Sequence, residues 1–215
     1  MSRIVFLMPE IIAGVTLLIP LLLVYQRFFF HSWKRTLAYL VFGAYLIAVL
    51  CLVGFPSIRD IRFDANINLI PIVGMADSIR DTLLNVLLFI PLGCFLPLLW
   101  VRYRSLLPAL GFGFLVSLTI EVSQLFTYRA TDVDDLITNV LGTLCGFLLA
   151  NGFTKGYTTH IGSGNSEKEL ALLCGSVVFV MFFLQPFLSL RFSINTHGLI
   201  SFPVSPFFLQ FLFTP

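Results

Sequence analysis

Residues 79–100 have the sequence IRDTLLNVLLFIPLGCFLPLLW, and this stretch decides the class of fold. Its two charged residues, Arg80 and Asp81, stand at its beginning, and apolar side chains make up almost all of the rest. A helix that crosses the hydrocarbon core of a bilayer needs about 20 predominantly apolar residues. We therefore expect residues 79–100 to form a membrane-spanning helix.

Similar apolar runs lie on both sides of this stretch, bounded by charged or turn-forming segments. They predict further spans near residues 4–25, 37–55, 107–128, 133–152 and 169–188. The chain of 215 residues is 58% hydrophobic and 11% charged, whereas ordinary soluble domains contain about 25% charged residues. The expected fold is all-α, a polytopic integral membrane helical bundle of about six transmembrane helices in a single membrane domain, residues 1–215.

The two ends of the chain and the longest connection carry further expectations. Pro9 and Glu10 interrupt the first apolar run and no small-residue cleavage site follows it, so we expect an uncleaved first span. The 57–78 connection is too polar and Pro-broken to cross, so we expect an ordered or interfacial loop there. In the 189–215 tail, Pro203 and Pro206 fall inside a short apolar run, which predicts an interfacial or re-entrant tail.

The orientation rests on Lys and Arg in the connections, where cytoplasmic loops carry an excess of positive charge. One face holds Arg27, Lys34, Arg35, Arg102, Arg104, Lys155 and Lys168. The other face holds Arg3, Arg59, Arg62, Arg80, Arg129 and Arg191, most of them beside aspartates. Because the first set has two clusters without an adjacent acid, we place it in the cytoplasm and both termini outside.

Polar residues gather at one membrane face in the third, fourth and fifth spans. They are Arg80, Asp81 and Asn85; Glu121, Gln124 and Arg129; and Asp132, Asp134, Asp135 and Asn139. Within each span most of them recur at three- and four-residue steps, which places them on one face of a helix. A carboxylate that faced lipid would cost a few kcal/mol, so the three polar stripes should face one another.

Two interpretations of these stripes compete. In the plainer one, the aspartates near residue 132 favour the positive end of a helix, while Glu121 and Gln124 lock helices together by hydrogen bonds. In the functional one, the set forms a solvent-connected polar pocket that binds a ligand, since ionisable residues within spans mark functional sites. The size of the set and the nearby arginines favour the pocket. Gly142-x-x-x-Gly146 in the fifth span predicts close helix packing instead.

Several classes of function are disfavoured. The net charge of +2 is too small for a nucleic-acid surface, so we expect no nucleic-acid partner. The histidines, His31, His160 and His197, lie away from the polar stripes, which argues against Ser-His hydrolysis. The four cysteines stand alone in apolar runs without metal-site spacing. The group of carboxylates could hold Mg²⁺ or Ca²⁺ through oxygen ligands, but carboxylates beside Arg129 need no cation for neutralisation, so we expect no metal and no cofactor.

Three blocks of residues resemble the signature of VanZ-like membrane proteins. They are Asn85-Val-Leu-Leu-Phe-Ile-Pro-Leu-Gly93; Ile120-Glu121-x-x-Gln124; and Arg129-x-x-Asp132-x-Asp134-Asp135-Leu-Ile-x-Asn139-x-Leu141-Gly142. Asn68-Leu-Ile-Pro71 is similar to a short motif that often precedes them, so the VanZ-like core covers residues 66–150. The resemblance implies a multi-pass protein of the bacterial cell membrane and a family linked to lowered teicoplanin susceptibility.

The stripes and the resemblance together favour an accessory, non-catalytic envelope protein. Its outward pocket would bind a lipid head group or a lipid-linked cell-wall precursor, with Arg80 and Arg129 facing phosphate. An alternative is a membrane enzyme acting on a lipid-linked phosphate or glycan, with Glu121 or Asp135 as general base. A second alternative is an ion-coupled transporter, but the charges stop at one face. The sequence does not specify the oligomeric state.

Overall fold

The computed structural model describes residues 3–59, 61, 63, 67–68, 79–127, 131–154 and 166–187. Within them, helical segments long and apolar enough to cross a membrane occupy Leu7–Phe30, Trp33–Val53, Ile79–Leu99, Leu106–Gln124, Val133–Gly152 and Glu167–Phe187. These six segments confirm the expected all-α polytopic bundle. The expected tail at 189–215 lies outside the described residues, as does most of the 57–78 connection.

Two spans end four or more residues from the predicted positions. The first span reaches Phe30 because the helix α1 (Arg3–Tyr25) continues into a π-helix, η1 (Gln26–Phe30). The fourth span, α5 (Leu106–Gln124), ends four residues before the predicted residue 128. Tight i to i−3 hydrogen bonds turn the chain there: the backbone N–H groups of Phe126 and Thr127 donate to Ser123 O and Gln124 O.

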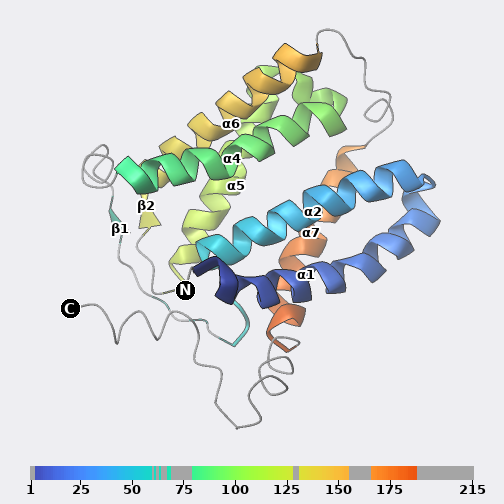
Figure 1. The fold of residues 1–215 in the computed structure, drawn as a ribbon, viewed down its shortest axis with the longest axis horizontal. Helices are drawn as coiled ribbons and strands as arrows, with labels where there is room; N and C mark the ends of the chain where they lie inside the picture. Colours follow the sequence, from blue (N-terminus) through green and yellow to red (C-terminus); the bar gives the residue numbers. More distant parts are fainter. Residues whose placement is uncertain are drawn as a thin grey trace. The chain divides into compact units, whose positions relative to one another are not determined.

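The chain divides into two compact units, Met1–Arg62 with Leu173–Pro215, and Phe63–Leu172. In the first unit, α1 and α2 (Trp33–Val53) lie antiparallel and side by side (Figure 1). His31, in the left-handed region at φ 50°, closes the connection between them by donating its N–H to Gln26 O. α7 (Glu167–Phe179) begins in the second unit and continues, with the π-helix η3 (Val180–Leu184), in the first.

In the second unit, α4 (Ile79–Leu99) packs most extensively against α6 (Val133–Thr154). The contact is close because glycines face backbone. A Cβ added at Gly93, Gly142 or Gly146 would lie 2.0–2.3 Å from a backbone oxygen of the facing helix. Small residues let membrane helices approach closely and gain dispersion energy that lipid tails do not supply. The predicted packing role of Gly142-x-x-x-Gly146 is confirmed.

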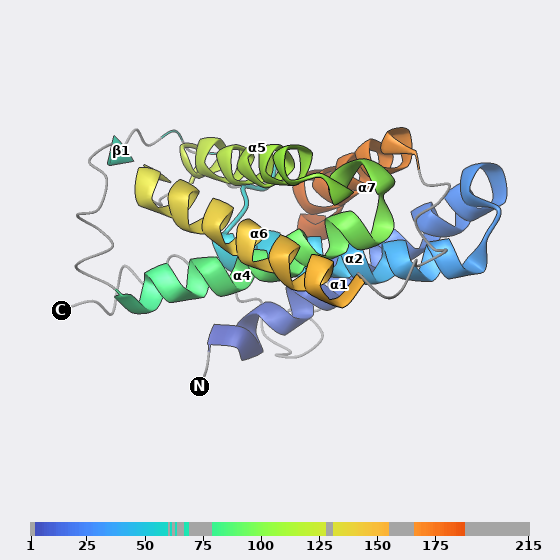
Figure 2. The ribbon, with the colours of Figure 1, turned by 90° about the horizontal axis from the view of Figure 1, so that it is seen from above.

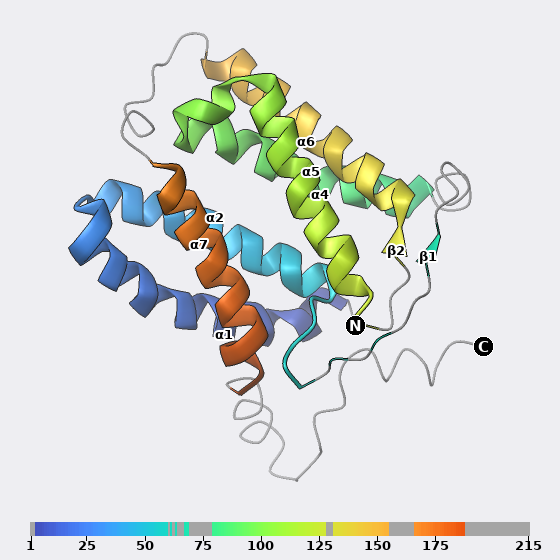
Figure 3. The same ribbon diagram turned by 180° about the vertical axis from the view of Figure 1, so that it is seen from behind.

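Short elements complete the second unit. The 3₁₀-helix η2 (Val101–Arg104) joins α4 to α5, and Arg102 forms an exposed ion pair with Glu167 at the start of α7. Two two-residue strands, β1 (Ile67–Asn68) and β2 (Thr131–Asp132), pair in parallel (Figure 3). The start of α4, the end of α5 and the start of α6 lie at the same end of this unit (Figure 2). The polar residues of the three helices are therefore level with one another.

Candidate functional site, a buried polar cluster among three spans

Polar residues follow one face of α5 over its last two turns. Ser117, Glu121 and Gln124 are separated by four and three residues, so they share a face of the helix. Their exposed fractions are 0%, 4% and 3%, so this face is turned away from lipid. Because α5 ends at Gln124, Glu121 lies about 5 Å from the helix end rather than the depth of roughly 10 Å that an end at residue 128 implies. The carboxylate is therefore closer to head-group level than the sequence predicts.

Asp132 begins α6 as its N-cap. Its Oδ1 accepts a hydrogen bond of 2.9 Å from the backbone N–H of Asp134, which satisfies one of the free donors of the first turn. Its Oδ2 accepts a hydrogen bond of 3.1 Å from Nδ2 of Asn68 on β1. The interpretation that Asp132 stabilises the start of a helix thus has direct support, because both of its carboxylate oxygens accept hydrogen bonds from within the protein.

Glu121 holds the connection between α5 and α6. Its Oε2 accepts a hydrogen bond of 3.0 Å from the backbone N–H of Asp132, and its backbone carbonyl accepts one of 3.0 Å from Oγ1 of Thr131. β2 is therefore tied to the last turn of α5, and β1 lies beside it through the pairing of Asn68 with Asp132. The carboxyl group of Glu121 points toward the backbone of β2.

Two side-chain hydrogen bonds join the three helices. Nδ2 of Asn85 on α4 donates to Oδ1 of Asp135 on α6 at 2.6 Å. One turn further along α6, Nδ2 of Asn139 donates to Oγ of Ser117 on α5 at 2.9 Å. These bonds place α6 between the polar faces of α4 and α5. We call the polar residues that α4, α5, α6 and the two short strands bring to this end of the unit the polar cluster: Asn68, Asn85, Ser117, Glu121, Gln124, Asp132, Asp135 and Asn139.

Two amide oxygens inside the polar cluster lack a hydrogen-bond partner among the described residues. They are Oε1 of Gln124 and Oδ1 of Asn139, on side chains 3% and 4% exposed. A buried polar group without a partner costs about 1–3 kcal/mol. The two amides are thus the part of the polar cluster with unused hydrogen-bonding capacity.

The other predicted site residues contribute no side chain to the hydrogen bonds of the polar cluster described above, or lie outside the described residues. Arg80 and Asp81 occupy the first turn of α4 with exposed side chains. Within the described chain Arg80 forms no hydrogen bond or ion pair, so its predicted role toward phosphate stays a prediction. Asp134 is buried at 3%, and its backbone carbonyl accepts from Oγ1 of Thr138. Arg129 lies outside the described residues.

The sequence-based list of site residues omits Ser117 and Asn68. Ser117 had a usable signal, because it lies four residues before Glu121 on the polar face of α5. Asn68 belongs to the short motif before the third span, but its partner, Asp132, is 64 residues away in sequence.

Among the described residues no three His, Cys, Asp or Glu side chains are grouped so that they could hold a metal ion. A ligand-binding role and a solvent connection for the cluster stay predictions.

Comparisons with known proteins extend over this unit. The family model described as VanZ/LLP1 matches residues 42–154. The chain is similar to the protein named VanZ of Enterococcus faecium, with 34% identity over 113 residues that cover 49% of this chain and 68% of the relative. No solved structure matches the chain. The family match includes α4, α5 and α6 and every residue of the polar cluster.

Proposed function

We propose, from the premise that this chain belongs to the VanZ/LLP1 family of membrane proteins, that its polar cluster binds the polar end of a membrane lipid or of a lipid-linked cell-wall precursor. In this proposal the protein is an accessory component of the bacterial envelope that binds its ligand without transforming it. With the orientation predicted from the basic residues of the connections, the cluster would lie at the outer face of the cell membrane.

The observation that carries the proposal is the pair of buried amides with unused hydrogen-bonding capacity. Gln124 lies at the end of α5 and Asn139 lies two turns inside α6, so together they follow the seam between the two helices. The carboxylates of Glu121 and Asp135 add acceptors along the same seam. A ligand with hydroxyl, amide or ammonium donors would satisfy the amide oxygens, and such donors are common in lipid head groups and cell-wall glycans.

In this proposal Arg80 and Arg129 recognise the anionic part of the ligand. Arg80 is exposed at the first turn of α4, at the same end of the unit as the cluster (Figure 2). Arg129 lies in the short connection between α5 and β2. A guanidinium group binds phosphate by paired, charge-assisted hydrogen bonds. The proposed ligand therefore has donors that reach between the helices and an anionic group that stays at the surface.

The test is recovery of the bound molecule from native membranes. The protein would be extracted with its surrounding lipid in polymer-bounded discs and the lipids identified by mass spectrometry. The double variant Gln124→Met, Asn139→Leu removes both amides at nearly constant volume and should lower the enrichment of the bound species about tenfold, since each lost hydrogen bond contributes about 0.5–1.5 kcal/mol. Arg129→Ala should lower enrichment of any phosphate-bearing species.

The matched control is Thr119→Val. Thr119 is exposed on the opposite side of α5, and its hydroxyl donates only along its own helix, to Leu115 O at 2.8 Å. This variant removes a polar atom from the same helix without touching the cluster, so enrichment should be unchanged. The proposal is wrong if no species is enriched over the bulk membrane, or if the double variant and Thr119→Val retain it equally.

The proposed effect on teicoplanin susceptibility depends on a ligand being bound in the polar cluster. If the cluster binds a precursor or lipid near the site of teicoplanin action, cells that produce the protein should tolerate more teicoplanin. The double variant should lose this protection while reaching the membrane in equal amount. If cells with and without the unaltered protein are equally susceptible to teicoplanin, the proposed link to the antibiotic is wrong, and only the proposed ligand binding is left.

A further inference from the structure

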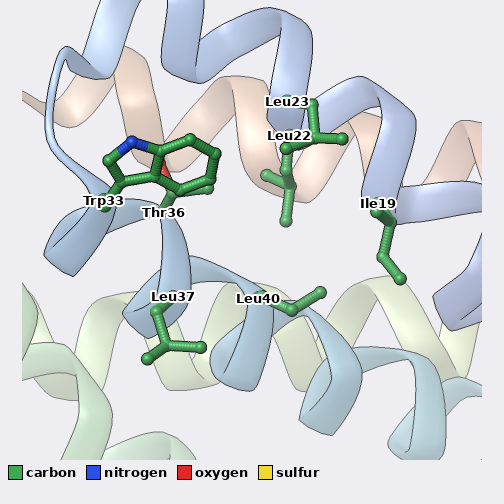
Figure 4. A pocket seen from close by; sticks show the side chains of 7 residues that line it. All are labelled: Ile19, Leu22, Leu23, Trp33, Thr36, Leu37 and Leu40. Carbon is green, nitrogen blue, oxygen red and sulfur yellow. The ribbon is translucent and has the colours of Figure 1, made fainter.

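A second candidate site lies in the first unit, far in sequence from the polar cluster. The end of α1 and the start of α2 form an open groove with a cavity volume of about 120 Å³ (Figure 4). Its lining residues are Ile19, Leu22, Leu23, Trp33, Thr36, Leu37 and Leu40. They recur at three- and four-residue steps on each helix, so the groove runs along the membrane-spanning segments.

The walls of this groove are apolar along its whole length. Its one hydroxyl, Oγ1 of Thr36, donates to Ser32 O at 3.1 Å and so offers no free donor to a ligand. Several lining side chains remain open to the surroundings, including Leu37 at 62% and Trp33 at 66%. From Trp33 to Leu40 the α2 wall extends about 10 Å. An alkyl chain fits this chemistry, and a polar ligand does not.

The end of the groove near Trp33 is basic. Lys34 follows Trp33 and is exposed, and Arg27 is exposed in η1 about one turn beyond Leu23. Arg35 lies in the same turn of α2. No Asp or Glu occurs between Glu10 and Asp60, so no acidic residue lies beside Arg27 or Lys34 in the sequence. Trp33 itself is of the type that sits at the level of lipid head groups.

We propose that this groove binds an anionic phospholipid. One acyl chain lies along Leu37 and Leu40, and the phosphate-containing head group contacts Lys34 and Arg27. Both parts of the lipid are required by the observations: the apolar walls select an alkyl chain, and the basic rim selects a negative head group over a zwitterionic one. Binding here is independent of the polar cluster and of the proposed envelope function.

Trp33 allows the proposal to be tested by its own fluorescence. The chain has two tryptophans, and Trp100→Phe leaves Trp33 as the sole emitter. The protein would be reconstituted in phosphatidylcholine vesicles that contain small fractions of either phosphatidylglycerol or phosphatidylcholine with brominated acyl chains, which quench a tryptophan in contact. Phosphatidylglycerol should quench at about fivefold lower mole fraction for each basic side chain that contacts the head group, and the preference should shrink in high salt.

Two further variants separate a groove site from a charged surface. Lys34→Gln with Arg27→Gln should abolish the preference between the two lipids while leaving quenching by brominated phosphatidylcholine. Leu40→Phe fills the groove and should weaken quenching by brominated phosphatidylglycerol severalfold although the charges remain. A thermal melt of each variant checks that the fold is retained.

Three results would overturn the proposal. Equal quenching of the unaltered groove by both lipids would exclude selection of an anionic head group. A preference that Leu40→Phe leaves unchanged would show that lipid collects at a basic surface without entering the groove. Trp33 emission that depends on protein density and responds to neither brominated lipid would show that a second copy of the chain occupies the groove.

Discussion

Because α4 and α6 are in close contact, we predict that one added methyl group, in Gly146→Ala, lowers the stability of the protein. Gly146→Ala would place a Cβ 2.0 Å from Ile90 O, 2.9 Å from the Ile90 carbonyl carbon and 3.0 Å from Cys94 N. All three are backbone atoms of α4, so no side-chain rotation relieves the clash. Sγ of Cys94 also donates to Gly146 O at 3.2 Å, and this bond would lengthen as the helices separate.

The expected cost follows from the displacement. Moving the Cβ from 2.0 Å to an ordinary contact of 3.4 Å requires the two backbones to part by about 1.4 Å. Overpacking of this kind costs about 1–3 kcal/mol, and the better helix propensity of alanine offsets up to about 1 kcal/mol. We expect a net loss of about 1–2 kcal/mol, which corresponds to a fall in Tm of about 2–8 °C for a chain of this length.

The assay is thermal unfolding of the purified protein in mild detergent, followed by the loss of its monodisperse gel-filtration peak. Gly152→Ala is the matched control, because it lies on the same helix and a Cβ there would meet nothing within 4 Å. The control should melt at or above the Tm of the unaltered protein. Equal melting of Gly146→Ala and Gly152→Ala would refute the close approach of α4 and α6.

Three further predictions use other parts of the chain. Asp132→Ala should lower stability by about 1 kcal/mol through loss of the N-cap of α6, whereas Asp132→Asn keeps an acceptor oxygen and most of the stability; equal melting of the two would contradict the cap. Glu167→Gln should leave Tm unchanged, because the side chains of Arg102 and Glu167 are 59% and 52% exposed and an exposed ion pair contributes little to stability. Their hydrogen bond does raise the pKa of Arg102. A fall in Tm of several degrees would contradict this prediction. In intact cells, an impermeant thiol reagent should label a cysteine placed at Arg62 but not one placed at Lys34, and the reverse pattern would invert the predicted orientation.

The hydrogen bonds at the start of α6 bear on which residues to test for function. Both carboxylate oxygens of Asp132 accept hydrogen bonds, and one carboxylate oxygen of Glu121 accepts a hydrogen bond from the connection that follows α5. Loss of activity on replacing either would therefore include a structural component. The amide of Gln124 is the better probe, because its Oε1 has no partner among the described residues, whereas Nδ2 of Asn139 also bonds Ser117 of α5.

The sequence by itself determined the six spans and the polar faces of α4, α5 and α6. Both follow from local properties, since bilayer thickness sets the length of an apolar helix and helical periodicity sets which residues share a face. The motifs around Asn85, Gln124 and Asn139 also indicate the family without any tertiary information. These conclusions needed no knowledge of which helices touch.

Only the tertiary structure decided which polar atoms meet. The end of α5 at Gln124, the pairing of Asn68 with Asp132 and the bond of Asn139 to Ser117 depend on how each helix is rotated and how closely its neighbour approaches. A periodic pattern identifies the face of a helix but not the partner opposite it, because many rotations and spacings bury the same face. Here glycines bring the backbones of α4 and α6 together, and that spacing lets Asn85 of α4 reach Asp135 of α6.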